Sequence, residues 1–317
     1  MLGGAVGWPL TGRAQTAGIR RIGVIYQGGP YEASIDGLRD GLSAAGLEEG
    51  RHVVLLPRNL RGDTAAVAEA AARALERDDK VDIIVAVTAR LALAAKRATV
   101  EVPIVFATGT DSVGVGLVDS VTAPCGRLTG FHFLTVDLTA KRLEILQEIV
   151  PKLRRVVTFY NPGIRTAVSA LATAQEAARK LGIDIVAQQV TSHEEVRERL
   201  RTLAFDEGDA YFFVSDAMVT SQAALIVEAA NALRLPTMAT NLSAVRAGAV
   251  AGYGPDFREY GRRAAGYVTR ILAGTLPRDL PVEAVTQPAL AINLKTAQAI
   301  GLDIPPLLLT RADEVIE

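Results

Sequence analysis

Polar side chains follow the ends of the apolar strands that this sequence predicts, and they are the residues best placed to bind a ligand. The loops concerned span residues 27–31, 88–90, 108–112, 161–163, 215–217 and 240–243. In and beside these loops, the candidate ligand-binding residues are Gln27, Tyr31, Thr88, Ala89, Arg90, Gly109, Thr110, Asp111, His132, Asn161, Ser215, Asp216, Asn241 and Tyr253. Hydroxyl, amide, carboxylate and guanidinium groups hold small solutes by hydrogen bonds and ion pairs, so these residues favour a binding cleft.

Several of these residues also have a purely structural interpretation. Gly28-Gly29-Pro30 and Asn161-Pro162-Gly163 are ordinary turn sequences. Asp111 and Asp216 directly follow predicted strands, where a carboxylate commonly caps the next helix. Tyr253, beside two glycines, is explained equally by packing or by a binding wall. Both interpretations stay open at each of these positions.

The sequence contains no recognisable catalytic motif. It lacks a G-x-G-x-x-G opening a helix after the first strand, a P-loop, a G-x-S-x-G elbow and an H-E-x-x-H pair. The three histidines, His52, His132 and His193, are far apart in the sequence, and Cys125 is the only cysteine. Metal and cofactor sites are therefore not expected, and an intrachain disulfide is impossible. Because no general acid, base or nucleophile stands out, we expect a protein that is not an enzyme.

Length and charge narrow the class of partner. The chain has 317 residues, which is long enough for two domains with separate cores. Its 34 basic and 35 acidic residues give a net charge of −1, so it carries no electrostatic footprint for nucleic acid or an anionic membrane. Beyond the N-terminus, no run of about 18 apolar residues predicts a membrane span.

The first residues differ in composition from the rest of the chain. Met1 to Leu10 is short, apolar and glycine-rich, and small residues Gly12 and Ala14 precede Gln15 where a signal peptidase would cut. A basic region before the apolar stretch is missing. We expect residues 1–18 to be a partial export signal, with a mature start near Gln15, and a disordered cytoplasmic leader is the alternative. No cysteine follows the expected cleavage point, which argues against a lipid anchor.

Apolar strands alternate with helical patterns along the whole chain. Residues 81–87 and 104–107 are apolar runs separated by a helical run, which predicts two parallel strands with a crossover helix. The same rhythm restarts after Gly130. We therefore predict an α/β protein with two doubly wound, Rossmann-like lobes joined by a multi-strand hinge. Facing lobes would bring the strand-end loops to opposite walls of one cleft.

The lobes are expected to be discontinuous in sequence. A strongly helical run at residues 260–273 and a proline-rich connector follow the second lobe without extending it simply. We expect residues 19–130 and about 256–280 to form the N-terminal lobe. Residues 131–255 and about 281–317 would form the C-terminal lobe, although the sequence leaves open which lobe owns the tail.

From residue 21 to the C-terminus, the sequence resembles the ABC-transporter substrate-binding protein family of the tryptophan-binding-like type, which has the type I periplasmic binding protein fold. The matching pieces are RIGVIY, the GL-x-x-GL pattern of residues 37–42, VDIIVA with LAAKRAT, PIVFATGTDSVGVGLV, the LTG of residues 128–130, KRLEIL, the Asn-Pro pair of residues 161–162, the YGPD of residues 253–256, and the closing INLKTAQAIGLDIPPLLLTRADEVIE. The resemblance implies a monomeric periplasmic receptor that closes on a small solute by hinge motion. It also implies delivery of the solute to a membrane permease that a separate ATPase powers.

Residues carried over by position from the family are Thr110, Asp111, Asn161, Asp216 and Tyr253. In family members that bind amino acids, a hydroxyl and backbone amides hold the carboxylate, and an acidic residue takes the ammonium. The resemblance makes Asp216 the candidate for the ammonium. A sensing module of the same fold, which passes closure to a signalling partner, is the alternative function.

Two loops depart from the family pattern. Thr88-Ala89-Arg90 stands where the family usually has Gly-Thr-Pro, which displaces the hydroxyl by one residue and adds an arginine. Asp111-Ser112-Val113-Gly114 stands where the family usually has Asp-Pro-Val-Gly. We hypothesise a carboxylate-bearing solute, an amino acid or an aromatic acid, held by Arg90 or by the helix N-terminus behind it. A solvated helix-start residue is the alternative role for Arg90.

Overall fold

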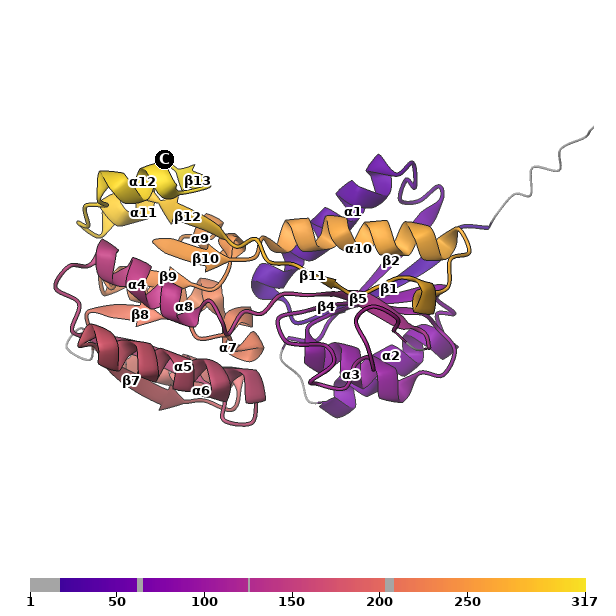
Figure 1. Ribbon diagram of the computed structural model, residues 1–317, viewed down its shortest axis with the longest axis horizontal. Helices are drawn as coiled ribbons and strands as arrows, with labels where there is room; N and C mark the ends of the chain where they lie inside the picture. The colour runs from indigo at the N-terminus through magenta and orange to yellow at the C-terminus, as the bar shows by residue number, and fades with distance from the viewer. Residues whose placement is uncertain (1–17, 62–64, 125, 203–207) are drawn as a thin grey trace, which may run out of the picture.

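The computed structural model describes residues 18–61, 65–124, 126–202 and 208–317, which form two α/β lobes side by side (Figure 1). The expected export signal, with its cleavage point near Gln15, lies outside the described residues, as does Cys125. Each lobe contains one twisted sheet with helices on both faces. The predicted fold class is confirmed.

The first lobe is built on a parallel sheet with the strand order β11-β5-β4-β3-β1-β2. Its strands are β1 (Arg20–Tyr26), β2 (Val53–Asn59), β3 (Ile83–Val87), β4 (Ile104–Thr108), β5 (Leu128–His132) and β11 (Glu283–Ala284). Its helices are η1 (Gly29–Glu32), α1 (Ala33–Ala44), α2 (Ala65–Arg77), α3 (Ala89–Ala98), α10 (Phe257–Leu272) and η3 (Pro277–Asp279). All five residues of β3 are buried, because helices cover both faces of the sheet.

Successive residues of β3 enter different cores. Ile83, Val85 and Val87 pack with α1 and α10, whereas Ile84 and Ala86 pack with α2 and α3. The two helix layers lie on opposite sides of the sheet (Figure 1). This explains why the sequence shows a continuous apolar run here rather than alternation.

The second lobe is built on a sheet with the strand order β13-β12-β10-β9-β8-β6-β7. Its strands are β6 (Arg155–Tyr160), β7 (Asp184–Gln189), β8 (Ala210–Phe212), β9 (Thr237–Ala239), β10 (Ala251–Gly254), β12 (Ala289–Asn293) and β13 (Glu314–Ile316). Its helices are α4 (Thr139–Ile149), α5 (Arg165–Leu181), α6 (His193–Thr202), α7 (Ala217–Ser221), α8 (Ala223–Ala232), α9 (Leu242–Arg246), α11 (Leu294–Ala299) and α12 (Pro306–Arg311). Only the pairing of β10 with β12 is antiparallel among the strand pairs described.

The chain passes between the two sheets after β5, after β10 and after β11. The two-residue strand β11 pairs with β5, so residues 283–284 lie in the first sheet, a few residues beyond the expected boundary near 280. Backbone N–H groups of Val282 and Val285 donate to carbonyl oxygens of Val121 and His132 and fix this register. We propose, on this basis, that the last crossing to the second lobe follows Ala284.

Glycines explain the GL-x-x-GL pattern in α1. A Cβ atom at Gly37 would collide with the carbonyl oxygen of Arg258, and one at Gly41 would lie 2.6 Å from the Cβ of Ala265. On the facing helix, a Cβ at Gly261 would collide with the carbonyl oxygen of Ser34. The two helix backbones therefore approach closely, which binds α10 to the first lobe although it follows the second lobe in sequence.

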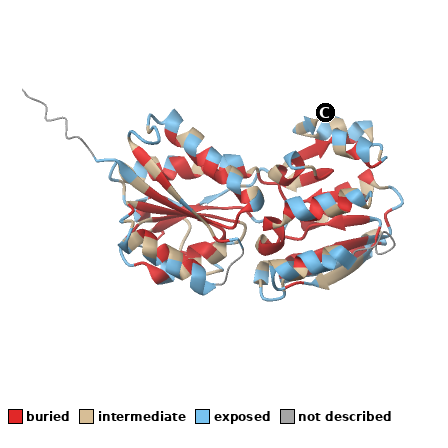
Figure 2. Ribbon diagram, turned by 180° about the vertical axis from the view of Figure 1, so that it is seen from behind, coloured by how far each residue is buried: buried red, intermediate tan, exposed pale blue. Residues whose placement is uncertain are grey.

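The outer faces of the helices are exposed and the central strands between them are buried, whereas the edge strand β7 is only partly buried (Figure 2). No helix within the described ranges is both long and apolar enough to span a membrane.

Candidate binding site

A cavity of about 120 Å³ lies between the two lobes. Its walls come from the loops after β3, β4 and β8, from η1, from the first crossover and from the start of α10. Threonine and serine side chains line it from both lobes, with Arg90 and Asp216 as its charged groups.

Part of the predicted residue set meets in this cavity. The predicted residues that line it are Tyr31, Thr88, Ala89, Arg90, Gly109, Thr110, Ser215 and Asp216. They come from four different strand-end loops, so the carboxyl edges of the two sheets face each other as the fold predicts.

Other predicted residues lie outside the cavity lining, where their side chains support local structure. Asp111 Oδ1 accepts the backbone N–H of Val113 at 3.0 Å, and Asn241 Oδ1 accepts that of Ala244 at 2.9 Å. Asp and Asn side chains commonly hold turns and cap helices in this way, which is the structural alternative to ligand binding.

His132, Gln27 and Tyr253 are likewise outside the cavity lining. His132 Nδ1 lies 3.1 Å from the hydroxyl of Ser112, and both residues are buried. Gln27 is 1% exposed, and its side-chain amide has no hydrogen-bond partner among the described residues. Tyr253 contributes its carbonyl oxygen, which accepts a hydrogen bond from Arg142 at 2.9 Å.

Asp216 is a buried carboxylate at the start of α7. Its Oδ1 accepts the N–H groups of Met218 at 2.9 Å and Val219 at 3.0 Å, and its Oδ2 accepts the N–H of Asn161 at 2.6 Å. Asn161 therefore acts on the site by holding Asp216. Burial raises the pKa of this carboxyl, while the three N–H donors and the charge of Arg90 oppose the rise. Oδ2 keeps one lone pair that a ligand cation can use.

Thr88 has a backbone conformation that suits glycine. Its φ angle is 108° and its ψ angle is 150°, and its hydroxyl oxygen accepts the N–H of Leu91 at 3.5 Å as the N-cap of α3. A residue with a Cβ in this region is strained by roughly 1–3 kcal/mol. The sequence departure at Thr88-Ala89-Arg90 thus replaces a glycine at the position where the backbone needs one.

Aromatic rings form one wall of the cavity. The rings of Tyr31 and Phe257 lie 4.6 Å apart, and Phe257 packs against Tyr260 at 5.7 Å. Burial raises the pKa of Tyr31, and the nearby charge of Asp216 raises it further. The sequence analysis missed Phe257 and Tyr260, because α10 is far along the chain from the other first-lobe residues that line the cavity. The YGPD motif just before α10 was the available signal.

Arg142 was also missed, although the KRLEIL motif contains it. It lies on α4 and is 0% exposed. Its Nη2 donates to the carbonyl oxygen of Thr135 at 2.6 Å, its Nε to that of Tyr253 at 2.9 Å, and its Nη1 to Ser215 Oγ at 3.5 Å. Burial lowers the pKa of Arg142 to about 9, so the guanidinium remains charged at neutral pH.

Half of the remaining missed lining residues are threonines. They include Thr135 on the first crossover, Thr166 at the start of α5 and Thr220 on α7. Their residue type gives no signal, because threonine is common in every structural setting. Thr240, by contrast, lies in a loop that the strand pattern had marked.

No group of three or more His, Cys, Asp or Glu side chains that could hold a metal ion occurs in the part of the chain that the structure describes.

A sequence model of the family of ABC transporter substrate binding proteins matches residues 21–316. The chain belongs to this family. The description of the family is that of proteins that bind the substrate of an ABC transporter.

Similar proteins extend this assignment. A tyrosine-binding protein of Clostridioides difficile is 26% identical over 262 residues, which cover 82% of this substrate-binding protein and 74% of the relative. A conserved domain protein from Vibrio cholerae has a TM-score of 0.81 and 30% identity over 93% of this chain and 99% of its own. An ABC domain in complex with L-Trp from Streptococcus pneumonia has a TM-score of 0.80 at 22% identity, covering 94% of this chain and 100% of its own, and so shares the fold.

The lobes of the substrate-binding protein touch at Gly29. A Cβ atom there would collide with the carbonyl oxygen of Ser221 on α7, and the φ angle of Gly29 is +58°. Beside this contact, Ser221 Oγ lies 3.0 Å from His193 Nε2 and donates to the carbonyl oxygen of Met218 at 2.7 Å. A residue without a side chain is thus needed where the first lobe meets the second.

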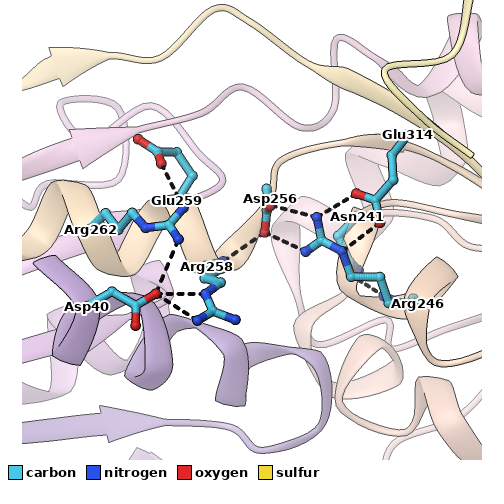
Figure 3. A network of polar contacts seen from close by, with 9 residues as sticks. Asp40, Asn241, Arg246, Asp256, Arg258, Glu259, Arg262 and Glu314 are labelled. Carbon is cyan, nitrogen blue, oxygen red and sulfur yellow. Dashed lines mark hydrogen bonds and ion pairs between the residues drawn. The ribbon is translucent and has the colours of Figure 1, made fainter.

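An ion-pair network surrounds the second crossover (Figure 3). Arg246 on α9 pairs with both oxygens of Asp256, at 3.1 and 2.9 Å, and with both oxygens of Glu314, at 2.9 and 2.6 Å. These two carboxylates raise the pKa of Arg246, and Arg246 keeps the pKa of Asp256 low against the opposing effect of burial. Asp256 also caps α10, so the network ties the second lobe to the helix that returns to the first.

Proposed function

We propose that this protein is the extracytoplasmic receptor of an ABC uptake transporter and that it binds a small carboxylate-bearing solute, an amino acid or an aromatic acid, between its lobes. The observation that carries the proposal is the cavity that both lobes line, with hydroxyls, one buried carboxylate and an aromatic wall. The tyrosine-binding relative and the L-Trp complex support an aromatic amino acid within this class.

The cavity residues assign distinct tasks to the parts of such a solute. Tyr31, Phe257 and Tyr260 supply a surface on which an aromatic side chain packs. Oδ2 of Asp216 accepts an ammonium hydrogen. Arg90, in the first turn of α3, and the adjacent N–H groups of that helix offer donors to a carboxylate.

Binding acts through hinge closure. Arg90 and Tyr31 belong to the first lobe and Asp216 to the second, so a solute in contact with all three makes its full set of contacts only when the lobes are together. The closed monomer then presents the solute to a membrane permease that a separate ATPase powers, on the outer side of the cytoplasmic membrane. Membership of the family supports this partnership.

A ligand screen tests the proposal. The purified protein is tested by thermal shift against amino acids, aromatic acids and their uncharged analogues, and mass spectrometry identifies any solute that co-purifies. We expect a carboxylate-bearing solute to raise the melting temperature in proportion to the logarithm of its concentration above its dissociation constant. A panel in which only the uncharged analogues raise the melting temperature would contradict the proposed ligand class.

A further inference from the structure

Arg142 brings a positive charge into the interior of the second lobe, and none of the described acidic residues pairs with it. It is 0% exposed, and its three hydrogen-bond acceptors are the carbonyl oxygens of Thr135 and Tyr253 and the hydroxyl of Ser215. Within residues 18–61, 65–124, 126–202 and 208–317, no Asp or Glu forms an ion pair with it. A buried charge with only neutral partners is unfavourable unless an opposite charge is supplied.

The guanidinium lies directly behind the cavity wall. Two of its three acceptors, Thr135 and Ser215, line the cavity. Ser215 Oγ accepts from Arg142 and lies 3.3 Å from the Thr135 carbonyl oxygen, to which Arg142 Nη2 already donates at 2.6 Å. The serine hydrogen can therefore turn to a ligand oxygen without leaving that carbonyl unsatisfied.

The charge is close enough to act on a ligand that it does not touch. An oxygen that accepts a hydrogen bond from Ser215 would lie about 6–7 Å or less from the Arg142 guanidinium. The intervening space is protein interior, in which water screens a charge poorly. A negative group at this point of the cavity is therefore favoured over a neutral one of the same shape.

We propose that Arg142 is the fixed cation that gives the cavity its preference for carboxylates, acting through Ser215 as a positioning and specificity-determining residue. This inference rests on the proposed function, because it names the group that selects the charge of the solute. The inference also gives different roles to two arginines. Arg90 lines the cavity from the first lobe, whereas Arg142 supplies its charge from behind the wall of the second lobe.

Two measurements on wild type, Arg142→Gln and Lys141→Gln test the inference. Lys141 is the matched control, because it is the neighbouring cation on α4 but is 43% exposed and pairs with Glu144 at the surface. Calorimetry compares L-tyrosine with L-tyrosinamide, which differ in the carboxylate. Melting temperatures are compared in equal concentrations of sodium acetate and sodium chloride, so that acetate serves as the smallest carboxylate probe.

We expect the wild type and Lys141→Gln to prefer L-tyrosine over its amide by about tenfold or more, and Arg142→Gln to lower this ratio severalfold, with Arg90 keeping the remainder. The extra melting-temperature rise in acetate should vanish in Arg142→Gln alone. Arg142→Lys, which keeps a cation, should retain part of the preference. A merely structural role would weaken both ligands in parallel and leave the ratio unchanged.

The outcomes separate this inference from the proposed function. If the wild type binds L-tyrosine and its amide equally, or Arg142→Gln lowers both affinities by the same factor, the role of Arg142 is wrong and the receptor function stands. If L-tyrosine does not bind but the acetate effect depends on Arg142, L-tyrosine fails as the solute and the role of Arg142 stands. If no carboxylate of the ligand screen, acetate included, stabilises the wild type, both the proposed ligand class and the role of Arg142 are overturned. Should Arg142→Gln not fold, Ser215→Ala replaces it, because losing the hydroxyl through which Arg142 acts should lower the same ratio, and an unchanged ratio would contradict the inference.

Discussion

The two walls of the cavity are built in different ways. In the first lobe, the wall is a strained turn at Thr88, an arginine in the first turn of a helix and a stack of aromatic rings. In the second lobe, the wall contains Asp216, whose two carboxylate oxygens are fixed by three N–H groups, with Arg142 held behind it by three acceptors. The first wall supplies shape, and the second supplies charges that are already in place before a solute arrives.

This difference suggests where selectivity resides. Because backbone groups of the second lobe hold Asp216 and Arg142, we expect both charges to keep their position when the lobes separate, and the second lobe to recognise a zwitterion or an acid by itself. The aromatic wall and Arg90 then contribute on closure. Substitutions in the second wall should therefore affect binding most strongly, and substitutions in the first should affect shape preference and stability.

The largest effect is expected for Asp216→Asn. The substitution would remove the negative charge. It would also place the amide N–H₂ group of Asn next to a backbone N–H that now donates to the Asp216 carboxylate. We therefore expect an amino acid to bind about a hundredfold more weakly. Asp111→Asn is the matched control, because that carboxylate also caps a turn but lies outside the cavity lining. Calorimetry with the best-binding amino acid measures both, and equal losses in the two variants would show that Asp216 has only a capping role.

Gly29→Ala should have the second-largest effect on ligand affinity. It disturbs the contact between the two lobes and changes no residue of the cavity lining. The added Cβ would collide with the Ser221 carbonyl oxygen when the lobes are together, so we expect roughly a tenfold loss of affinity and a more open ligand-free protein by small-angle scattering. Gly46→Ala controls for backbone strain, since Gly46 also has a positive φ of 79° but a Cβ there would meet nothing within 4 Å. Unchanged affinity in Gly29→Ala would mean that this contact is not made in the solute-bound state.

Thr88→Gly tests whether the wall of the first lobe contains a strained turn. The φ angle of 108° is accessible to glycine without strain, so we expect the free energy of unfolding to rise by about 1 kcal/mol after the greater freedom of the unfolded glycine is included. Lys80→Gly provides the comparison at a positive φ of 49° away from the cavity. Chemical denaturation measures both variants, and a clear loss of stability in Thr88→Gly would show that its weak cap to Leu91 outweighs the strain.

The smallest effect is the pH dependence that Asp216 contributes. Burial raises the pKa of this carboxyl in the folded protein above its ordinary value of 3.8, so the folded state binds the proton more tightly than the unfolded state. Its contribution to stability is therefore complete below pH 3.8 and is lost as the pH rises through the raised folded pKa. As the pH falls through the folded-state pKa toward 3.8, the free energy of unfolding of the wild type should rise relative to that of Asp216→Asn. Chemical denaturation at several pH values measures this difference. A relative loss would contradict the raised pKa.

The sequence predicted much of the fold because hydrophobic runs are local signals. The apolar run around residues 83–87 needs no distant partner to be identified as a buried strand. The two-residue strand β11 has no such signal, because only its pairing with β5 makes it a strand. The GL-x-x-GL pattern was visible from sequence, but its cause, the close approach of α10, depends on residues more than two hundred positions away.

The site was predicted at the level of loops and less well at the level of side chains. Asp111 and Asn241 follow predicted strands as Asp216 does, yet Asp111 holds a turn and Asn241 caps α9, both outside the cavity lining. Which carboxylate faces a cavity depends on the lobe opposite, and a single strand-end pattern does not contain that information. Arg142 was missed for a related reason, since an arginine in a helical pattern is normally a solvated residue.

The most direct test of the account is small-angle scattering with and without the best-binding amino acid or aromatic acid of the screen. We predict that a saturating solute decreases the radius of gyration of the wild type, because contacts from both walls are complete only with the lobes together. Calorimetry on the same sample shows that the site is occupied. A solute that binds tightly and leaves the radius of gyration unchanged would contradict closure between the two walls.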